Sequence, residues 1–568
     1  MVRAAPRLAL LALALACVAA SPRAALGSSV GFGPEASRAL DLEAWERLQE
    51  LGEITDASDG SLERTFLSPA SRRAMDVALA WMRDAGMRTW TDEAGNVHGR
   101  VDGAAAAAAP PSSSPSSSSR PSAAAVLVGS HLDTVRDAGK YDGALGVVLG
   151  IAAVKALVLE YGGAANLPRP IHVVGFSDEE GVRFGSTFLG SRALVGAVPD
   201  DVFDRVADAD GLSFLDALRL NGFEGTRAAV ERATLDPADV AAYVEVHIEQ
   251  GPVLQRAREP AAAVSAIAGQ TRLAVRLRGD QGHAGTVPMR GRKDAVAAAA
   301  EMIHNLETRC APPPAREGER GEAAEEEAAE VHARDATADD DDESSSSSSS
   351  SSSLVDDSLV CTVGDVRVWP GASNVIAGGV NFTVDIRART DAARESAVAD
   401  AIQSFEATCA TRGMRCDVER AHDAPATPCD ADVAAALERA VRVTASEAAA
   451  GRGGASEAAI RPSEQGGDSS SEGGDSRGGG GESLVGQLVS GAGHDALAMA
   501  ERFKIGMLFV RCLDGVSHSP LERAEPEDVA FAARALAHYL REVQEDAEGG
   551  EGGGGAKEEK RREGREEL

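Results

Sequence analysis

Residues 129–146 read GSHLDTVRDAGKYDGALG, and the apolar run Ala123–Val128 leads directly into them. A short apolar run bounded by Ser- and Pro-rich sequence is typical of a buried strand. His131 and Asp133 stand two residues apart, on one side of the strand end, and Asp142 follows in a glycine-containing turn before a long apolar helix. An imidazole, a neighbouring carboxylate that holds its second ring N–H and a further carboxylate are what a metal site needs. Alone, the same residues also fit a strand-end histidine capped by an aspartate.

Further predicted strands end in polar residues of the same kinds. Pro170–Phe176 is followed by an acidic segment, Tyr243–Gly251 ends in His and Glu, and a histidine follows Lys504–Val510. Strands that alternate with helices indicate a mixed, mostly parallel α/β sheet with helices on both faces. Ligands bind such sheets outside the carboxyl ends of the strands. The polar residues at these ends are His131, Asp133, Asp142, Glu179, Glu180, His247 and His518.

Three histidines with an aspartate and a glutamate suffice for two divalent ions bridged by one carboxylate. Two such ions suit hydrolysis, because they lower the pKa of a shared water and polarise a carbonyl. A carboxylate that is not a ligand must then accept the proton and return it to the leaving nitrogen. In the adjacent pair Glu179-Glu180, one residue can ligate while the other faces the water. The alternative for this pair alone is two acids at a helix amino terminus.

The pattern changes near Ala262 and changes back near Pro425. Between these points the order is strand, helix, two strands, helix, strand, which is typical of a ferredoxin-like α+β domain inserted into the first. The predicted organisation is a signal segment 1–27, a catalytic domain in two parts, 36–261 and 425–545, the inserted domain 262–424 and an acidic tail 546–568. Low-complexity inserts are predicted to be disordered at 312–356 and 449–483, with a loop insertion at 104–122.

The net charge of −32 is concentrated in this low-complexity sequence. Residues 315–357, 449–483 and 545–568 carry net charges of −12, −3 and −4. Such segments are typical of solvated disorder and argue against nucleic-acid binding. The seven cysteines include no CxxC pair. Cys409 and Cys416 are close enough in sequence to form a disulfide, but we expect the cysteines to be free buried thiols.

The amino terminus predicts targeting. Arg3 and Arg7 precede the apolar run Leu8–Ala20, and small residues follow. This is a secretory signal pattern, too short for a membrane span. We therefore expect the endoplasmic reticulum or the secretory pathway, with a plastid or mitochondrial transit peptide as the alternative, and no membrane association after signal removal.

Seven ordered segments resemble the two-metal amidohydrolases related to metallo-aminoacylases and carboxypeptidase-like peptidases, and in particular their ureido-hydrolysing branch. They cover nearly all of residues 40–542 outside the low-complexity inserts. The segments are GSHLDTVRDAGKYDGALGV, FSDEEGVRFGSTFLGSRAL, YVEVHIEQGPVL, AIAGQTRLAVRLRGDQGHAGTVPM, PGASNVIAGGVNFTVDIRAR, LVSGAGHDALAMA and GMLFVRCLDGVSHSPLE. The inserts fall between these segments, so they are expected to be loops.

The resemblance implies a role for each matching residue in the metal centre. One metal would be held by His131, Asp142 and His247, and Asp142 would bridge to a second metal held with Glu180 and His518. Asp133 would orient His131. Glu179 would be the general base.

The resemblance also implies a set of residues that bind the substrate. His283 would stabilise the oxyanion across a dimer interface formed by the inserted lid and dimerisation domain. Arg387 would bind the substrate carboxylate, as suits its bidentate fork. Ureido groups would be bound by Gln270 and Asn374, and the loop of Gly491 and Gly493 would line the pocket. From the residues alone, His283 fits an exposed turn and Arg387 a surface ion pair.

The implied reaction is hydrolysis of the ureido group of allantoate to ureidoglycine, ammonia and carbon dioxide, in purine and ureide catabolism. The implied cofactor is Mn²⁺, two per subunit, although the ligand types allow Zn²⁺. The implied partners are a small-molecule ureide and a second copy of the chain in a homodimer. The alternatives are hydrolysis of N-carbamoyl-L-amino acids or ureidoglycolate, and a non-catalytic binding protein of the same fold.

Overall fold

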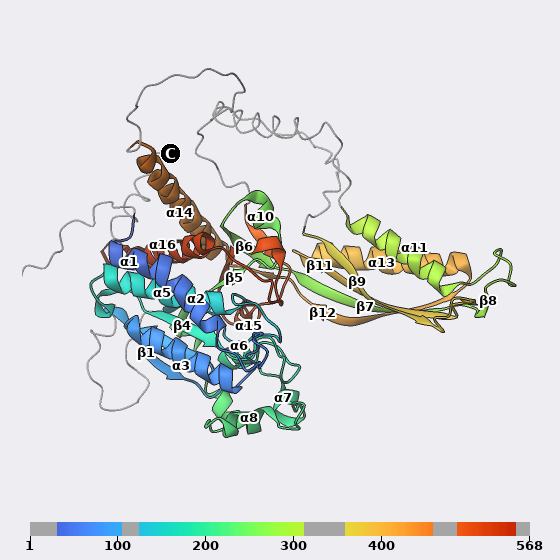
Figure 1. The fold of residues 1–568 in the computed structure, drawn as a ribbon, viewed down its shortest axis with the longest axis horizontal. Helices are drawn as coiled ribbons and strands as arrows, with labels where there is room; N and C mark the ends of the chain where they lie inside the picture. The colour runs from blue at the N-terminus through green and yellow to red at the C-terminus, as the bar shows by residue number, and fades with distance from the viewer. Residues whose placement is uncertain (1–30, 105–123, 312–357, 458–485, 553–568) are drawn as a thin grey trace, which may run out of the picture.

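The computed structural model describes residues 31–104, 124–311, 358–457 and 486–552, whose strands form two main sheets (Figure 1). The predicted signal segment, most of the low-complexity sequence and the end of the tail lie outside these residues. Within the described ranges, no helix has both the length and the apolar character needed to cross a bilayer.

The larger sheet has nine strands in the order β1-β2-β4-β3-β5-β15-β6-β13, with β14 also paired to β6. Its centre, β4-β3-β5-β15, is parallel, whereas β1, β2, β6 and β13 join in antiparallel pairs. The predicted mixed sheet is therefore confirmed, with a parallel core. The strands are β1 Arg88–Thr91, β2 Val97–Val101, β3 Ala125–His131, β4 Ile171–Phe176, β5 Val240–Ile248, β6 Ala261–Ile267, β13 Thr427–Pro428, β14 Leu488–Ser490 and β15 Ile505–Val510.

Helices cover both faces of this sheet, and a separate cluster of buried apolar side chains lies between the helices and the sheet on each face. One face carries α5 (Ala144–Glu160), α14 (Ala431–Glu457) and α16 (Pro526–Gly552). The opposite face carries α6 (Leu189–Val195) and α15 (Asp495–Met499). The amino-terminal helices lie on the α5 side (Figure 1): α1 Pro34–Arg38, a π-helical turn Ala39–Glu43, α2 Ala44–Gly52 and α3 Pro69–Asp84.

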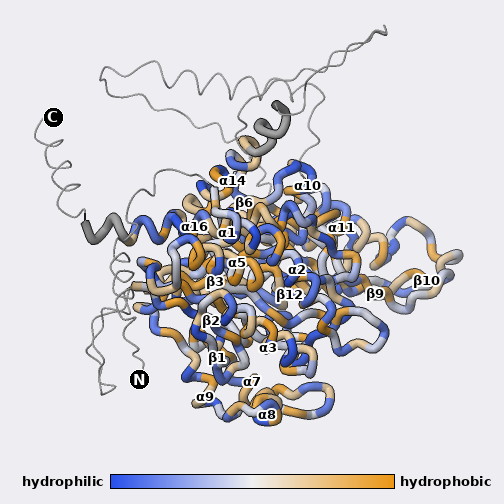
Figure 2. Tube along the Cα trace, turned by 60° about the vertical axis from the view of Figure 1, so that its left-hand side comes forward, coloured by the Kyte–Doolittle hydropathy of each residue, from blue (hydrophilic) through white to orange (hydrophobic). Residues whose placement is uncertain are grey.

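The helix after the opening motif, α5, is apolar on every side because it is enclosed on every side. Thirteen of its 17 residues are buried, and hydrophobic residues gather around it in Figure 2. Gly146 lets its first turn approach β5, since a Cβ there would lie 2.2 Å from the carbonyl oxygen of Val246. This close packing holds the Asp142 turn beside the carboxyl end of β5.

Several elements of this domain were not predicted. β6 is alanine-rich, which disfavours a strand locally, and it forms because it pairs with β15, more than 200 positions later. Four helices of five to seven residues are too short to display helical periodicity. They are α7 Asp200–Asp204, α8 Phe214–Leu220, α9 Arg227–Glu231 and α10 Val253–Ala257.

The inserted segment forms a four-stranded antiparallel sheet in the order β12-β7-β11-β9, with α11 and α13 packed on one face (Figure 1). This is the predicted ferredoxin-like arrangement of strands. A two-stranded pair, β8 with β10, lies at the end remote from the larger sheet (Figure 1). The elements are β7 Gly269–Arg278, β8 Gly282–His283, α11 Ala295–Cys310, β9 Val360–Trp369, β10 Val375–Ile376, β11 Gly379–Ala388, α13 Asp391–Arg412 and β12 Arg415–Ala424.

The expectation of free thiols is wrong for four cysteines. Cys310 is joined to Cys361 and Cys409 to Cys416, with Cα–Cα distances of 6.0 and 6.1 Å. Both bonds lie in the inserted segment, where the fold brings the end of α11 beside β9 and the end of α13 beside β12. Cys429 and Cys512 are free and buried, as expected.

The helices α14 and α16 run further than predicted. α14 continues to Glu457 and α16 to Gly552, beyond the expected ends at 449 and 545. Residues 450–457 and 546–552 each contain three glycines, which disfavour helix, so the local sequence predicted an earlier end for both helices. The predicted insert 449–483 and tail 546–568 therefore begin inside helices.

Candidate metal centre

The parallel core brings the predicted ligands together. His131 is the last residue of β3 and is in register with Phe176, the last residue of β4. His247 lies at the end of β5, in register with Phe509 of β15. Because these strands are parallel, the loops that follow them meet at one edge of the sheet. The side chains of His131, Asp142, Glu179, Glu180, His247 and His518 converge there.

Asp142 stands between two groups of ligand atoms. Its Oδ1 lies 3.1 Å from Nε2 of His247 and 3.5 Å from Nε2 of His131. Its Oδ2 lies 3.3 Å from Nε2 of His518, which is itself 3.5 Å from Oε1 of Glu180. Each group keeps its ligand atoms within 4.8 Å of one another. The carboxylate therefore offers one oxygen to each group, which is the arrangement of a bridging ligand.

A third group places both glutamates of the pair near His131. Oε2 of Glu179 lies 3.8 Å from Nε2 of that imidazole, and Glu179, Glu180 and His131 also meet the same 4.8 Å limit. Glu179 is buried, with 7% of its surface exposed. Its buried carboxylate therefore lies beside His131 of one ligand group and Glu180 of the other, a position from which it could accept a proton.

The backbone sets the tautomer of the two buried histidines. Nδ1 of His131 lies 2.9 Å from the carbonyl oxygen of Asp133, and Nδ1 of His247 lies 2.9 Å from that of Ile248. A carbonyl only accepts hydrogen bonds, so each Nδ1 carries the proton and each Nε2 is free to ligate.

The predicted role of the Asp133 carboxylate needs correction. Its Oδ1 is 3.8 Å from Nδ1 of His131, too far for a hydrogen bond. The carboxylate instead accepts the backbone N–H groups of Glu179, over 3.0 Å, and Glu180, over 3.2 Å. Asp133 thus orients His131 through its carbonyl and the glutamate pair through its side chain.

Burial and mutual charge shift the pKa values of the cluster. Burial would raise the pKa of Asp142, but hydrogen bonds from three histidines hold it well below its usual value. Burial alone would lower the pKa of His131, yet Glu179 and Asp142 raise it well above its usual value. Burial raises the pKa of Glu180 to about 7, and the hydrogen bond to Asp142 raises that of His518 to about 9. The raised pKa values of His131, Glu180 and His518 mean that these side chains hold protons on atoms that would ligate a dication once the protons leave. The set of nitrogen and oxygen donors fits Mn²⁺ or Zn²⁺.

Three residues around Asp142 were missed. Gln250 donates to Oδ2 of Asp142 over 2.9 Å, and Ser517 donates to the same atom over 2.5 Å. Glu522 accepts the backbone N–H of Asp142 over 3.1 Å. They stand in the quoted segments YVEVHIEQG and GVSHSPLE, so their nearness to His247 and His518 was the available signal.

Some of the predicted substrate-binding residues lie together where the inserted segment joins the larger sheet. Arg387 donates to the carbonyl oxygen of Gly491 over 2.5 Å and to Oδ1 of Asp385 over 2.9 Å. Gln270 donates to Oδ2 of the same aspartate over 2.6 Å. Asp385, which the sequence did not single out, holds Arg387 and Gln270 in place and forms the ion pair that we kept as the alternative for Arg387.

The loop after β14 adjoins the predicted metal ligands. A Cβ on Gly493 would lie 3.0 Å from the ring of Phe188. The buried ring of His494 lies 4.4 Å, between centroids, from that of His247, and its Nε2 is 2.8 Å from Oγ of Ser490. This loop therefore links the ligand His247 to the Gly491 carbonyl that Arg387 contacts.

His283 and Asn374 are not brought to this place. The backbone N–H of Ala284 donates to the carbonyl oxygen of Asn374, and both predicted residues are exposed in the segment around β8 and β10. Gln270 lies at the start of β7, whereas His283 lies in β8, five positions beyond the end of β7, whose ten residues span roughly 30 Å. Within one chain, the segment around β8 and β10, which carries His283 and Asn374, thus lies at the end of the inserted segment remote from the larger sheet and its candidate ligands (Figure 1).

Comparisons with known proteins place the chain among peptidases and amidohydrolases of related sequence. Residues 127–462 match the model of peptidase family M20/M25/M40. The chain is 44% identical to allantoate deiminase 1 of Glycine max, covering 88% of this chain and 89% of that protein. It is 31% identical to an N-carbamoyl-L-amino-acid amidohydrolase of a Pseudomonas species, covering 86% and 95%. It resembles the crystal structure of a hydantoinase/carbamoylase family amidase from Burkholderia ambifaria, with 28% identity, a TM-score of 0.65 and coverage of 89% and 97%.

Proposed function

The chain belongs to peptidase family M20/M25/M40, and from this premise we propose that it is a metal-dependent amidohydrolase of allantoate. The observation that carries this proposal is the convergence of His131, Asp142, His247, Glu180 and His518 around the buried carboxylate of Glu179. The similarity to allantoate deiminase supports allantoate as the substrate.

We propose two metal ions per subunit, both Mn²⁺. His131, Asp142 and His247 would hold one, and Asp142, Glu180 and His518 the other. When bound, the ions lower the pKa of a water and polarise the carbonyl that it attacks. Imidazole and carboxylate ligands suit manganese and also accept zinc.

Glu179 moves the proton in this scheme. Its carboxylate accepts a proton from the attacking water and returns it to the leaving nitrogen. The C–N bond of the ureido group breaks, ureidoglycine leaves, and the carbamate that remains decomposes to ammonia and carbon dioxide. Asp133 keeps Glu179 in place, since it accepts the Glu179 backbone N–H over 3.0 Å.

Arg387 binds the carboxylate of the substrate. Its guanidinium is already oriented by Asp385 and by the Gly491 carbonyl, so little side-chain entropy is lost when the substrate binds. Gln270, held by the same Asp385, hydrogen-bonds a ureido group.

We further propose that the active enzyme is a homodimer, in which His283 and Asn374 of one copy complete the site of the other. Two observations support this. These residues are remote from their own metal centre, and β9 is an edge strand with exposed apolar side chains. Such an edge favours pairing with a second chain. The exposed residues are Val360, Val366, Val368 and Trp369.

The localisation proposal remains the endoplasmic reticulum or the secretory pathway, with a plastid or a mitochondrion as the alternative. The signal pattern at residues 1–27 and the two disulfides support it, since disulfides persist in oxidising compartments. A fluorescent fusion to residues 1–40 tests it. Reticular fluorescence is expected, and plastid or mitochondrial fluorescence would favour the alternative.

Hydrolysis of N-carbamoyl-L-amino acids is the second candidate, because the chain is 31% identical to such an amidohydrolase. The test offers the Mn²⁺-loaded protein allantoate, ureidoglycolate and N-carbamoyl amino acids, and measures ammonia. The expected result is the highest kcat/KM with allantoate. A higher value with another ureido compound would replace the substrate in this proposal but leave the reaction class unchanged.

A further inference from the structure

Glu522 is a buried carboxylate to which the reaction gives no part. It is 6% exposed and lies four positions after His518. Its Oε1 accepts the backbone N–H groups of Tyr141, over 2.8 Å, and Asp142, over 3.1 Å. The carboxylate therefore fixes the turn that carries the predicted bridging ligand, from a segment 380 positions away.

A second path connects Glu522 to the side chain of Asp142. Oε2 of Glu522 lies 3.2 Å from the hydroxyl of Ser517, which donates to Oδ2 of Asp142 over 2.5 Å. Gln250 donates to the same Oδ2 over 2.9 Å and to the Ser517 hydroxyl over 3.1 Å. Both the backbone and the carboxylate of Asp142 are thus held from one side, which fixes the direction of its two oxygens.

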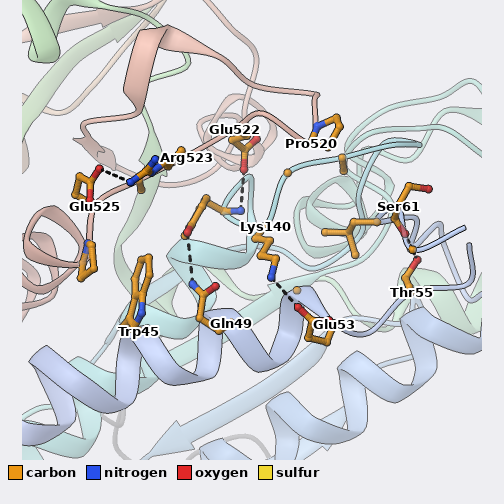
Figure 3. A pocket seen from close by; sticks show the side chains of 18 residues that line it. Trp45, Gln49, Glu53, Thr55, Ser61, Lys140, Pro520, Glu522, Arg523 and Glu525 are labelled. Carbon is orange, nitrogen blue, oxygen red and sulfur yellow. Dashed lines mark hydrogen bonds and ion pairs between the residues drawn. The ribbon is translucent and has the colours of Figure 1, made fainter.

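The surroundings show that Glu522 is not part of a salt bridge. It forms the inner wall of a cavity of about 650 Å³ (Figure 3). The cations of that wall are paired elsewhere, Lys140 with Glu53 at 2.7 Å and Arg523 with Glu525 at 3.2 Å. Within the part of the chain that the structure describes, Glu522 meets no lysine or arginine within ion-pair distance. Its hydrogen bonds are directed at the Asp142 turn and at Ser517.

We propose that Glu522 is a positioning residue, which holds Asp142 so that each of its oxygens faces one of the two groups of candidate ligands. The inference rests on the proposed function only in that Asp142 binds metal; it does not depend on the substrate. It acts through hydrogen bonds, because glutamine can make the same set. The amide oxygen of a glutamine can accept both N–H groups, and its NH₂ can donate to the Ser517 hydroxyl.

The test compares Mn²⁺ binding to the metal-free full chain and to two variants by calorimetric titration. Glu522→Ala should weaken binding by about 10- to 100-fold, as is usual when a residue that orients a ligand is removed. Glu522→Gln should restore affinity to within roughly threefold of the parent. At saturating Mn²⁺, Glu522→Ala should lower kcat and leave KM unchanged, since the carboxylate-binding Arg387 lies on the inserted segment.

A matched control and a rescue sharpen the comparison. Glu525→Ala removes a carboxylate of the same cavity that pairs with Arg523 rather than with the Asp142 turn, and it should leave Mn²⁺ affinity unchanged. Because the cavity borders the truncated side chain, added formate should restore part of the affinity of Glu522→Ala. Formate should not change the affinity of the parent.

The outcomes separate this inference from the proposed function. If the parent binds no Mn²⁺, the proposed function fails. If the parent binds Mn²⁺ and a folded Glu522→Ala variant binds it equally well, the inference is overturned. It is also overturned if Glu522→Gln loses as much Mn²⁺ affinity as Glu522→Ala. Should Glu522→Ala not fold, Ser517→Ala cuts the link to Oδ2 alone. Weaker binding in that variant supports the inference, and unchanged binding overturns it.

Discussion

Oδ1 of Asp133 accepts the backbone N–H of Glu179 over 3.0 Å, although 46 positions separate the two residues. This contact joins the loop after β3 to the loop after β4 and holds the proposed base beside the predicted metal ligands. The site thus depends on backbone hydrogen bonds between loops as well as on the ligands themselves.

Glu179→Gln should keep the metal and lose turnover. The amide cannot accept the proton of the attacking water, and general bases contribute about 10²- to 10⁴-fold to rate. We expect kcat to fall by that range, while the metal content, measured by elemental analysis, stays that of the parent. Full activity in this variant would refute the assignment of the base.

Gly143→Ala should disrupt the metal site. The residue has φ of +66°, and a Cβ there would lie 2.3 Å from the ring of His131. We expect Mn²⁺ affinity to fall by about tenfold or more, because a displaced imidazole no longer meets Asp142.

The control for that change is Gly60→Ala. Gly60 also has a positive φ, +88°, but nothing lies within 4 Å of its Cβ position. Both variants pay a similar backbone cost of about 1 kcal/mol, visible in thermal unfolding. Equal Mn²⁺ affinity in the two would show that the contact with His131 is unimportant.

Mn²⁺ affinity should rise with pH. The pKa of Glu180 is raised to about 7 and that of His518 to about 9, so these ligands keep their protons to a higher pH than usual in the metal-free protein. Metal binding must release those protons, so competition is strongest at low pH and fades as pH rises. Titrations from about pH 6 to pH 9 should give a steadily increasing association constant and proton release. A constant affinity across this range would contradict the shifts.

Arg387→Ala should raise KM for allantoate. A hydrogen-bonded charge contributes about 1.5–3 kcal/mol, which corresponds to a roughly 10- to 100-fold increase, with kcat little changed. Arg387→Lys should give a KM between those of the parent and of Arg387→Ala, because lysine keeps the positive charge but lacks the bidentate fork. Arg272→Ala is the control: Arg272 pairs with the same Asp385, over 3.1 Å, but was not assigned to substrate. The assignment of Arg387 fails if both alanine variants raise KM equally.

Two inactive variants should restore activity when mixed. His247→Ala removes a metal ligand, and His283→Ala removes a residue proposed to act in the other subunit. After unfolding and refolding together in equal amounts, half the dimers are mixed, and each mixed dimer contains one intact site. About a quarter of the parent activity is expected. Activity no greater than that of the separate variants would place His283 outside the partner's site.

Most of the candidate ligands could be predicted because they stand at the ends of apolar strand segments or just after them. His131, His247 and the Glu179-Glu180 pair needed only a parallel sheet to meet, and alternating strands and helices indicated one. The inserted sheet was similarly readable, since β7 and β11 alternate buried and exposed residues. Local sequence thus predicted most of the topology and the positions of the candidate ligands.

The hydrogen bonds around those ligands could not be predicted in the same way. Glu522 meets Asp142 between two loops, and Ser191 of α6 meets Asp495 of α15, each pair across several hundred positions. Such meetings depend on backbone turns that sequence periodicity does not report, as at Gln250 and His518, which have φ of +56° and +54°. The Cys310–Cys361 disulfide could not be predicted from the local sequence either, because the two cysteines are 51 positions apart.

We propose above that this chain hydrolyses allantoate with a metal centre. The most direct measurement is ammonia release from allantoate by the full chain, first stripped of metal and then reloaded with Mn²⁺. We expect no ammonia from the stripped protein, and one ammonia per allantoate consumed after reloading, together with ureidoglycine. Unchanged allantoate in the presence of protein that has bound two Mn²⁺ per subunit would contradict the proposal.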